Sequence, residues 1–281
     1  MDVSNQGQSE QAALWNGASG RSWVEAQELL DRMFMPLESL LVEAALAKPR
    51  KRVLDIGCGT GAVTLALKRR LGKEVECVGV DISAPMLDHA RSRAERDGAQ
   101  VSFIRADAEH HAFETHNFDL IVSRFGVMFF ADSVRAFENL RRAARADAQL
   151  CLIAWRSASE NPFMTAAERA VASLLPEVPP RDPDAPGQFN FGDPNRVQRI
   201  FEQSGWTNVE IRKLDVECSF ATRDLSRYLT RLGPIGRFLQ QADERTKKHV
   251  LAAALPAFDP YVHGGTVRFN AACWQIGTLV R

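Results

Sequence analysis

Between residues 52 and 155, short apolar runs alternate with longer stretches in which apolar residues recur every three or four positions. A short continuous apolar run is typical of a buried parallel strand, and the longer recurrence is typical of an amphipathic helix. Strands alternating with helices predict an α/β fold, a doubly wound and mostly parallel sheet with helices on both faces. The predicted strands are residues 52–57, 75–81, 101–107, 118–126 and 148–155.

The chain changes character on either side of this alternation. Residues 1–13 are polar without periodicity, which predicts disorder, whereas residues 22–46 have helical spacing that Pro36 is expected to kink or break. Six of the 13 prolines fall between residues 156 and 192. The predicted divisions are an N-terminal helical cap (1–47), a core (48–155), an inserted cap over the strand ends (156–192), and the rest of the core with further cap helices (193–281).

The pattern after residue 205 is less regular. Residues 206–220 are predicted to form one long strand or a pair of strands. Two helices are expected, around residues 225–232 and 242–255, and an imperfect alternation predicts a last strand at 265–281.

The composition narrows the classes of function. Lysine plus arginine and aspartate plus glutamate number 35 each, so the chain lacks the basic excess typical of a nucleic-acid-binding protein. Its five cysteines are scattered without a C-x-x-C pair, which argues against a disulfide framework and a zinc site. No stretch approaches the roughly 20 apolar residues that span a bilayer, and the polar N-terminus is unlike a signal peptide. We expect a cytoplasmic protein without a metal.

Three glycines, Gly57, Gly59 and Gly61, follow the first predicted strand. Ligands of open α/β sheets bind beyond the carboxyl ends of the strands. Residues without a Cβ let a ligand approach the backbone and the free N–H groups of the next helix. The alternative is a tight turn that binds nothing, but three glycines in five positions favour a ligand site.

Aspartates accompany three of the predicted strands and indicate the kind of ligand. Asp55 lies inside the first strand, Asp81 ends the second and Asp107 ends the third. A carboxylate can bind ribose hydroxyls but repels a pyrophosphate. The G-x-G-x-G spacing also differs from the dinucleotide motif, whose third glycine corresponds to Ala62. These residues favour a positively charged nucleoside, although each aspartate alone could be a cap or turn residue.

Four motifs in this order and spacing resemble those of the class I S-adenosylmethionine-dependent methyltransferases, in particular the small-molecule branch related to ubiquinone and menaquinone biosynthesis. They are VLDIGCGTG (53–61), VGVDIS (78–83), IRADAEHHAF (104–113) and FDLIVSRFGVMFF (118–130). The resemblance covers roughly residues 14–155. It implies a Rossmann-like seven-stranded sheet whose last strand is antiparallel. It also implies S-adenosylmethionine as cofactor, S-adenosylhomocysteine as its product, and a small-molecule acceptor.

The resemblance further implies a set of cofactor-binding residues. Asp55 and the three glycines would hold the methionine part, Asp81 the ribose hydroxyls and Asp107 the adenine amino group. Ile82 and Met86 would lie against the adenine, and Ser123 and Arg124 would lie near the methionine and the methyl group. Trp15, Cys58 and Ala108 complete the set.

Two tryptophans precede these motifs. Residues 14–23 are similar to family members whose N-terminal helix closes over the cofactor, so Trp15 or Trp23 could seal the ligand. Helix packing is the alternative for both residues, and it is the interpretation we favour for Trp23.

Transfer of an activated methyl group is an in-line displacement, so the protein has to position two partners and needs no nucleophile. A hydroxyl or thiol acceptor would be helped by a base. His110 and His111 are the candidates because they closely follow Asp107, with a surface or structural role as the alternative. Arg124 is a third candidate for a catalytic residue, because it could pair with an acidic group of the substrate. The alternative is that it pairs only with a carboxylate on a helix.

The acceptor site is expected beneath the inserted cap and the C-terminal helices. Apolar candidates dominate its expected lining, which fits a small apolar or aromatic acceptor. They are Phe125, Met128, Phe129, Trp155, Phe163, Phe189, Phe191, Phe238 and Tyr261.

Other functions stay open on the sequence. An NAD(P)-dependent oxidoreductase on a similar sheet is disfavoured by Asp55, by Asp107 and by the lack of a Tyr-x-x-x-Lys pair. A non-catalytic nucleoside-binding protein would be expected to have lost a motif carboxylate, and none is lost. Methylation of RNA or protein is a third alternative, and the zero net charge disfavours RNA. The caps could also form the interface of a homodimer.

Overall fold

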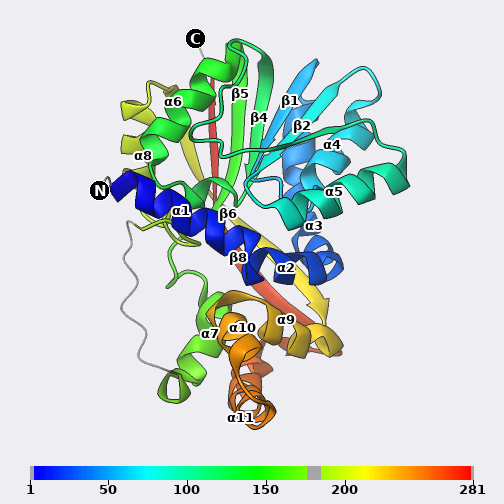
Figure 1. Cartoon of the computed structure of the whole chain (residues 1–281), viewed down its shortest axis with the longest axis vertical. Helices are drawn as coiled ribbons and strands as arrows, with labels where there is room; N and C mark the ends of the chain where they lie inside the picture. The colour runs from blue at the N-terminus through cyan, green and yellow to red at the C-terminus, as the bar shows by residue number, and fades with distance from the viewer. Residues whose placement is uncertain (1–2, 176–184, 280–281) are drawn as a thin grey trace.

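A single mixed sheet forms the centre of the computed structural model, which describes residues 3–175 and 185–279 (Figure 1). Seven strands follow one another in the order β3-β2-β1-β4-β5-β8-β6, and the short β7 pairs with β8. The strands are β1 Arg52–Ile56, β2 Glu76–Asp81, β3 Ser102–Arg105, β4 Phe118–Arg124, β5 Ala144–Trp155, β6 Thr207–Ala221, β7 Val262–His263 and β8 Thr266–Leu279.

The first five strands pair in parallel, and β8 runs antiparallel between β5 and β6. This confirms the predicted doubly wound sheet with an antiparallel last strand. The strand order reverses direction between β1 and β4, which is where open α/β sheets place their ligands.

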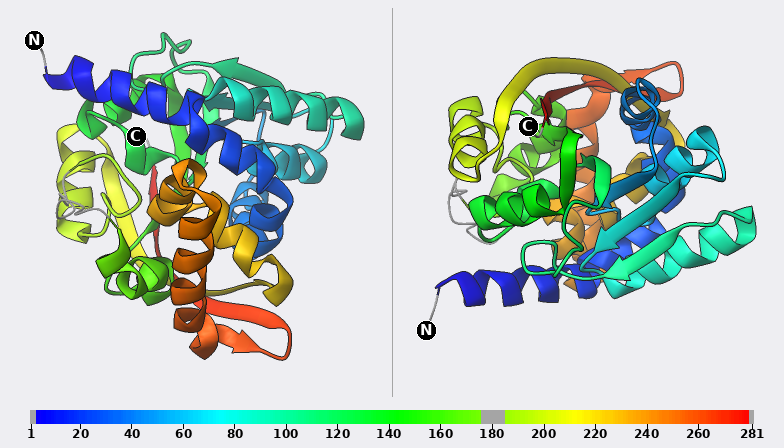
Figure 2. Two further views of the ribbon diagram at one scale, coloured as in Figure 1. Left: turned by 60° about the horizontal axis from the view of Figure 1, so that its bottom comes forward. Right: turned by 90° about the horizontal axis from the view of Figure 1, so that it is seen from above.

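Helices cover both faces of the sheet (Figure 2). On one face α3 packs against α4, and on the other α6 packs against α8. The helices are α1 Val3–Asn16, α2 Ala18–Glu25, α3 Gln27–Leu46, α4 Ala62–Leu71, α5 Ala84–Asp97, α6 Ser133–Ala143, α7 Pro162–Ala170, α8 Pro194–Gln203, α9 Leu225–Arg231, α10 Gly233–Gln241 and α11 Glu244–Ala254.

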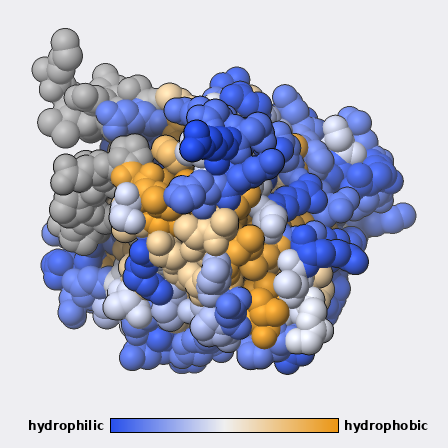
Figure 3. Space-filling model, turned by 90° about the horizontal axis from the view of Figure 1, so that it is seen from below, coloured by the Kyte–Doolittle hydropathy of each residue, from blue (hydrophilic) through white to orange (hydrophobic). Residues whose placement is uncertain are grey.

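A helical lobe made of α7 and α9–α11 lies beyond the carboxyl ends of the parallel strands (Figure 1). The long ribbon of β6 and β8 reaches from the sheet into this lobe. Helices α1 and α2 cross between sheet and lobe. Figure 3 views the molecule from the lobe end and shows apolar surface in the middle of that face, with hydrophilic residues around it.

The N-terminal region differs from the prediction in two respects. The disorder predicted for residues 1–13 is wrong from Val3 onward, because Val3–Asn16 is helical. Asn16 anchors this helix: its Nδ2 donates to the Ile82 carbonyl at 3.1 Å, and its Oδ1 accepts from the Ala84 N–H at 2.9 Å. Pro36 does not break the following helix, since it lies inside α3 and the break falls at Ala26.

The C-terminal region contains one helix more than predicted. Three helices, α9 to α11, occupy residues 225–254, and residues 207–221 form one strand rather than two. Gly233, Pro234 and Gly236 are typical turn residues, so the sequence pattern does not predict a helix where α10 forms. Burial of Ile235 and Leu239 in the lobe stabilises this helix. Part of the predicted inserted cap, residues 176–184, lies outside the described residues.

Phe137 of α6 tests how tightly the core is packed on the side of the sheet that α6 covers. Its side chain is fully buried, with ring centroids 4.5 Å from Phe201 and 6.3 Å from Phe191. Phe137→Ala should lower the free energy of unfolding by about 3–5 kcal/mol through lost burial and a cavity. Met35→Ala is the control, because that side chain is 59% exposed. Urea unfolding measures both, and a loss under about 1 kcal/mol for Phe137→Ala would contradict the packing described.

Candidate functional site

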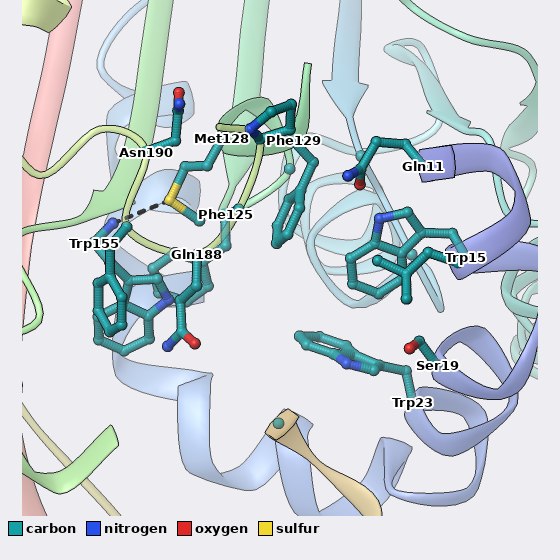
Figure 4. A pocket seen from close by; sticks show the side chains of 18 of the residues that line it. Gln11, Trp15, Ser19, Trp23, Phe125, Met128, Phe129, Trp155, Gln188 and Asn190 are labelled. Carbon is teal, nitrogen blue, oxygen red and sulfur yellow. Dashed lines mark hydrogen bonds between the residues drawn. The ribbon is translucent and has the colours of Figure 1, made fainter. Parts of the chain in front are cut away.

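A cavity of about 1100 Å³ opens at the carboxyl ends of the parallel strands. Its walls come from α1 and α2, the turns after β1 to β4, the inserted segment and the helical lobe. Figure 4 shows side chains from α1, α2, the segment after β4, the end of β5 and the inserted segment around one space.

The turn after β1 explains its three glycines by different constraints. A Cβ on Gly57 would lie 2.5 Å from the Gly126 Cα, so packing excludes a side chain there. A Cβ on Gly61 would lie 3.0 Å from the Phe103 ring, which would have to shift, and its φ of +83 also favours glycine. A Cβ on Gly59 would meet only Met86, at 3.7 Å. Gly59 has φ +54 and lines the cavity, so the ligand argument applies best there.

Asp81 ties this turn to the end of β2. Its Oδ2 accepts from the Gly59 N–H and its Oδ1 from the Ser83 N–H, both at 2.8 Å. Burial raises the pKa of Asp81, while these two N–H groups act in the opposite direction. The carboxylate also lines the cavity, so it can accept further hydrogen bonds from a ligand there.

Asp55 lies beneath the cavity and is not part of its lining. It is buried and accepts a 2.6 Å hydrogen bond from the Thr64 hydroxyl. The pKa of Asp55 is raised to about 7, mainly by burial. The Thr64 hydrogen bond and the charge of Arg124 oppose this rise, and the charge of Asp81 adds to it. Asp55 is therefore poised to change charge near neutral pH.

Asp107 and Ala108 line the cavity beyond β3. Asp107 accepts from the Glu109 N–H at 2.9 Å, and the His110 Nδ1 lies 3.3 Å from its second oxygen. Asp107, Glu109 and His110 place ligand-type atoms within 4.8 Å of one another, a spacing that these local contacts account for.

Glu109 is a lining residue that the sequence analysis missed. Its Oε2 accepts from the N–H groups of Ala131 and Asp132, both at 3.1 Å, so it ties the loop after β3 to the loop after β4. Burial raises the pKa of this carboxyl.

The two candidate bases are outside the cavity lining. The His110 ring contacts Asp107, and the His111 ring packs edge-on against Phe113 at 4.6 Å. Their base role stays a prediction, and it would require a ring to turn toward the cavity.

The structure divides the other predicted cofactor residues into two groups. Some line the cavity, namely Trp15, Gly57, Gly59, Asp81, Ile82, Met86, Asp107, Ala108 and Arg124. Others support that wall from behind, namely Asp55, Cys58, Gly61 and Ser123. Ser123, for example, is buried and donates a 2.7 Å hydrogen bond to the Ile56 carbonyl, which joins β4 to β1.

Both N-terminal tryptophans line the cavity (Figure 4). The Trp15 carbonyl accepts a 2.6 Å hydrogen bond from the Ser83 hydroxyl. Its ring packs edge-on against Trp23 at 5.9 Å and Phe129 at 5.1 Å. Trp15 and Trp23 therefore pack against other aromatic rings and also line the cavity, so the packing and sealing interpretations are compatible.

The rest of the cavity is largely apolar. Of the nine expected acceptor-site residues, six line it: Phe125, Met128, Phe129, Trp155, Phe163 and Phe189. Phe191, Phe238 and Tyr261 do not. Phe125 and Trp155 stack at 4.4 Å with nearly parallel rings, and the Gly187 N–H of the inserted segment donates to the Met128 carbonyl at 3.0 Å.

Several lining residues gave no signal in the sequence. Gln11 and Ser19 come from α1 and α2, and their Oε1 and Oγ atoms are buried without a hydrogen-bond partner (Figure 4). Tyr228 comes from α9, and its hydroxyl lies 3.5 Å from the Met164 sulfur. Only the folded arrangement brings these separate helices to one cavity.

Comparison with known proteins identifies the core. Residues 53–147 match the family described as "Methyltransferase domain". The demethylmenaquinone methyltransferase of Thermus thermophilus is 39% identical over 112 residues, which cover 40% of this chain and 50% of that protein. The 2-phytyl-1,4-naphtoquinone methyltransferase of Trichormus variabilis is 30% identical over 131 residues, which cover 46% of this chain and 57% of that protein.

The chain spans about half the length of these curated relatives. The fold is shared with the solved YcgJ protein of Bacillus subtilis, at a TM-score of 0.56 and 21% identity over 87% of this chain and 97% of that one. Residues 53–147 are therefore similar to a methyltransferase domain, and the likenesses do not support an oxidoreductase. No helix within residues 3–175 and 185–279 is long and apolar enough to cross a membrane.

The raised pKa of Asp55 makes stability depend on pH. Between the ordinary Asp value of 3.8 and about 7, the folded chain binds a proton here that the unfolded chain releases. The free energy of unfolding therefore falls as pH rises through this window, by about 4 kcal/mol at 1.36 kcal/mol per pKa unit. Asp55→Asn should remove that fall, whereas Asp88→Asn, with a 73% exposed side chain, should keep it.

Urea unfolding at pH 4, 5.5, 7 and 8 gives the difference between wild type and Asp55→Asn. A difference that stays constant over this range would mean that the pKa of Asp55 is the same in the folded and unfolded chains, contrary to its burial beside Thr64.

Proposed function

We propose that this protein, whose residues 53–147 match a methyltransferase domain, is a class I enzyme that transfers the methyl group of S-adenosylmethionine to a small apolar or aromatic acceptor. The observation that carries the proposal is a single cavity with two chemically different ends. One end has glycine backbone and the carboxylates of Asp81 and Asp107. The rest is mainly aromatic and aliphatic, with charged residues such as Asp193, Arg199 and Arg231 also in the lining.

The residues at the polar end fit the cofactor. Asp81 offers carboxylate oxygens for ribose hydroxyls, and Asp107 offers them for an adenine amino group. The buried Met86 and half-buried Ile82 supply apolar contacts for a base. A pyrophosphate would instead be repelled by Asp81 and Asp107.

The other end fits an apolar acceptor. The stacked Phe125 and Trp155 form one wall, and Phe163, Leu229 and Phe258 continue it into the lobe. A pocket that is mainly apolar with a few polar groups is typical of a small-molecule site. The Tyr228 hydroxyl is such a group, since its only described hydrogen-bond contact is a thioether sulfur.

The chemistry asks little of the protein beyond placement. The sulfonium of the cofactor supplies an activated methyl group, so no residue has to act as a nucleophile. The chain's contribution is to hold both partners in line and to exclude water, which Trp15, Trp23 and the inserted segment are placed to do.

In this proposal the divisions of the chain acquire roles. Residues 48–155 bind the cofactor, while the described parts of the two caps, residues 3–47 on one side and 156–175 with 185–192 on the other, cover the cavity. We also propose a cytoplasmic enzyme that acts on a small molecule rather than on nucleic acid. The support is the balance of 35 basic and 35 acidic residues and five cysteines that are buried and free.

A thermal-shift comparison tests the function. The ligands are S-adenosylmethionine, S-adenosylhomocysteine, NAD and NADP, each at about 100 times a typical dissociation constant, where binding adds about 2.7 kcal/mol. The two sulfur nucleosides should raise the melting temperature and the dinucleotides should not. A shift with NAD or NADP alone would make the protein an oxidoreductase and overturn the proposal.

Asp81→Ala tests the ribose contact. Loss of a charged acceptor should weaken S-adenosylhomocysteine binding by roughly 10- to 100-fold, equivalent to about 1.5–3 kcal/mol. Asp88→Ala is the matched control in the helix that follows, with its side chain 73% exposed. Calorimetric titration measures both, and circular dichroism checks that the variant is folded. An unchanged affinity in folded Asp81→Ala would place the cofactor elsewhere.

A further inference from the structure

The tryptophans of the chain differ in what their indole N–H groups bond to. Trp206 donates to the Phe137 carbonyl at 2.9 Å, and Trp274 donates to the Gly192 carbonyl at 3.4 Å. Neither of these two rings lines the cavity. Trp155 does line it and is only 3% exposed, yet no acceptor for its indole N–H lies among the described residues. A tryptophan buried to this extent usually has a partner for its N–H, so the partner has to come from the cavity.

Water and a ligand are the two possible partners, and they have different consequences. Trp15 and Trp23 also line the cavity without a described acceptor for their N–H groups, but both rings are half-buried, which leaves them open to solvent. At the buried Trp155, a ligand that enters the apolar end displaces any water on the N–H. Such a ligand has to replace that hydrogen bond or lose affinity.

The Trp155 ring is held in one orientation. The Phe125 ring stacks on it at 4.4 Å with 7° between the planes, and the Phe34 ring packs edge-on at 5.9 Å. The backbone N–H of Trp155 donates to the Met128 sulfur at 3.4 Å. Because these contacts fix the direction of the indole N–H before a ligand arrives, a hydrogen bond to it costs little conformational entropy.

Gln188 of the inserted segment brings a second uncharged hydrogen-bonding group to this part of the cavity. Its neighbour Gly187 donates to the Met128 carbonyl, so Met128 anchors both the inserted segment and Trp155. The Gln188 side chain lines the cavity and bonds to no residue that the structure describes. Figure 4 shows the Trp155 and Gln188 side chains at one edge of the open space. Together they offer a fixed donor and an amide that can donate or accept.

We propose that Trp155 and Gln188 bind an uncharged oxygen on the aromatic acceptor, a ring hydroxyl or a ring carbonyl. The oxygen accepts from the Trp155 N–H. The Gln188 amide accepts from a hydroxyl or donates to a carbonyl. The inference rests on the proposed function and narrows its acceptor to aromatic compounds that carry such an oxygen, which makes Trp155 and Gln188 specificity-determining residues.

The experiment compares two probes that differ by one hydroxyl. Equilibrium dialysis measures the affinity of protein saturated with S-adenosylhomocysteine for 1-naphthol and for 1-methylnaphthalene, in which a methyl group replaces the hydroxyl. Trp155→Phe keeps an aromatic ring against Phe125 but loses the N–H, and Gln188→Met keeps the length of the side chain but loses the amide. Each change should lower the ratio of the two affinities by roughly 3- to 10-fold, the effect of one hydrogen bond.

Trp206→Phe is the matched control, because it removes an indole N–H that bonds to the Phe137 carbonyl outside the cavity. Its ratio should equal that of wild type. Circular dichroism checks the fold of each variant. Gln188 lies in a turn of the inserted segment, so Gln188→Met tests the inference even if Trp155→Phe fails to fold.

A second pair of probes separates the two kinds of oxygen. The same variants are compared for 1-tetralone, which carries a ring carbonyl, and for tetralin, which lacks it. A ratio that falls only for the tetralone pair assigns a carbonyl to the site, and one that falls only for the naphthol pair assigns a hydroxyl. A fall in both pairs means that the site accepts either oxygen.

If both ratios are unchanged in folded Trp155→Phe and Gln188→Met, or fall equally in Trp206→Phe, the inference is overturned while the proposed function stands. It is also overturned if wild type binds S-adenosylhomocysteine but neither 1-naphthol nor 1-tetralone. If wild type binds neither S-adenosylmethionine nor S-adenosylhomocysteine, the proposed function itself fails, and this inference fails with it.

Discussion

The turns after β1 and β4 meet at Gly57 and Gly126, and the site depends on that contact. A Cβ on Gly57 would lie 2.5 Å from the Gly126 Cα, and a Cβ on Gly126 would lie 2.7 Å from the Gly57 Cα, so neither position accepts a side chain. Ser123 secures the contact, since its hydroxyl donates to the Ile56 carbonyl and accepts from the Gly126 N–H. The reversal of strand order at this point then leaves the turns beyond β1 and β4 facing one cavity.

Charges gathered around this contact give the cavity its chemistry. Asp55 and Asp81 are buried, Arg124 is nearly so, and burial raises the pKa of both aspartates. Removing such groups from water costs free energy that their neighbours in the chain offset incompletely. A polar ligand at this end would supply partners for Asp81 and Arg124, which line the cavity, whereas an apolar ligand would not. The apolar second end, toward the lobe, is suited to a different molecule.

The sequence predicts the parts of the site whose signals are local. Continuous apolar runs mark β1 to β5, and the residues that end them, such as Asp81, reach the cavity as expected. Contacts between distant parts of the chain leave no such signal. Helix α1 is held by hydrogen bonds between Asn16 and the turn after β2. Arg124, at the end of β4, lies next to Glu38 of α3. His110 shows the converse, because its proximity to Asp107 in sequence does not put its ring on the cavity wall.

The crystal structure of the protein with S-adenosylhomocysteine, grown near pH 8, is the most direct test of the central claim. The account predicts the ligand at the polar end of the cavity, with its ribose hydroxyls on Asp81, its adenine beside Asp107, and its amino-acid head at the glycine turn after β1, near Arg124. A ligand bound away from the turn after β1, or oriented with its amino-acid head toward Asp107, would contradict the account.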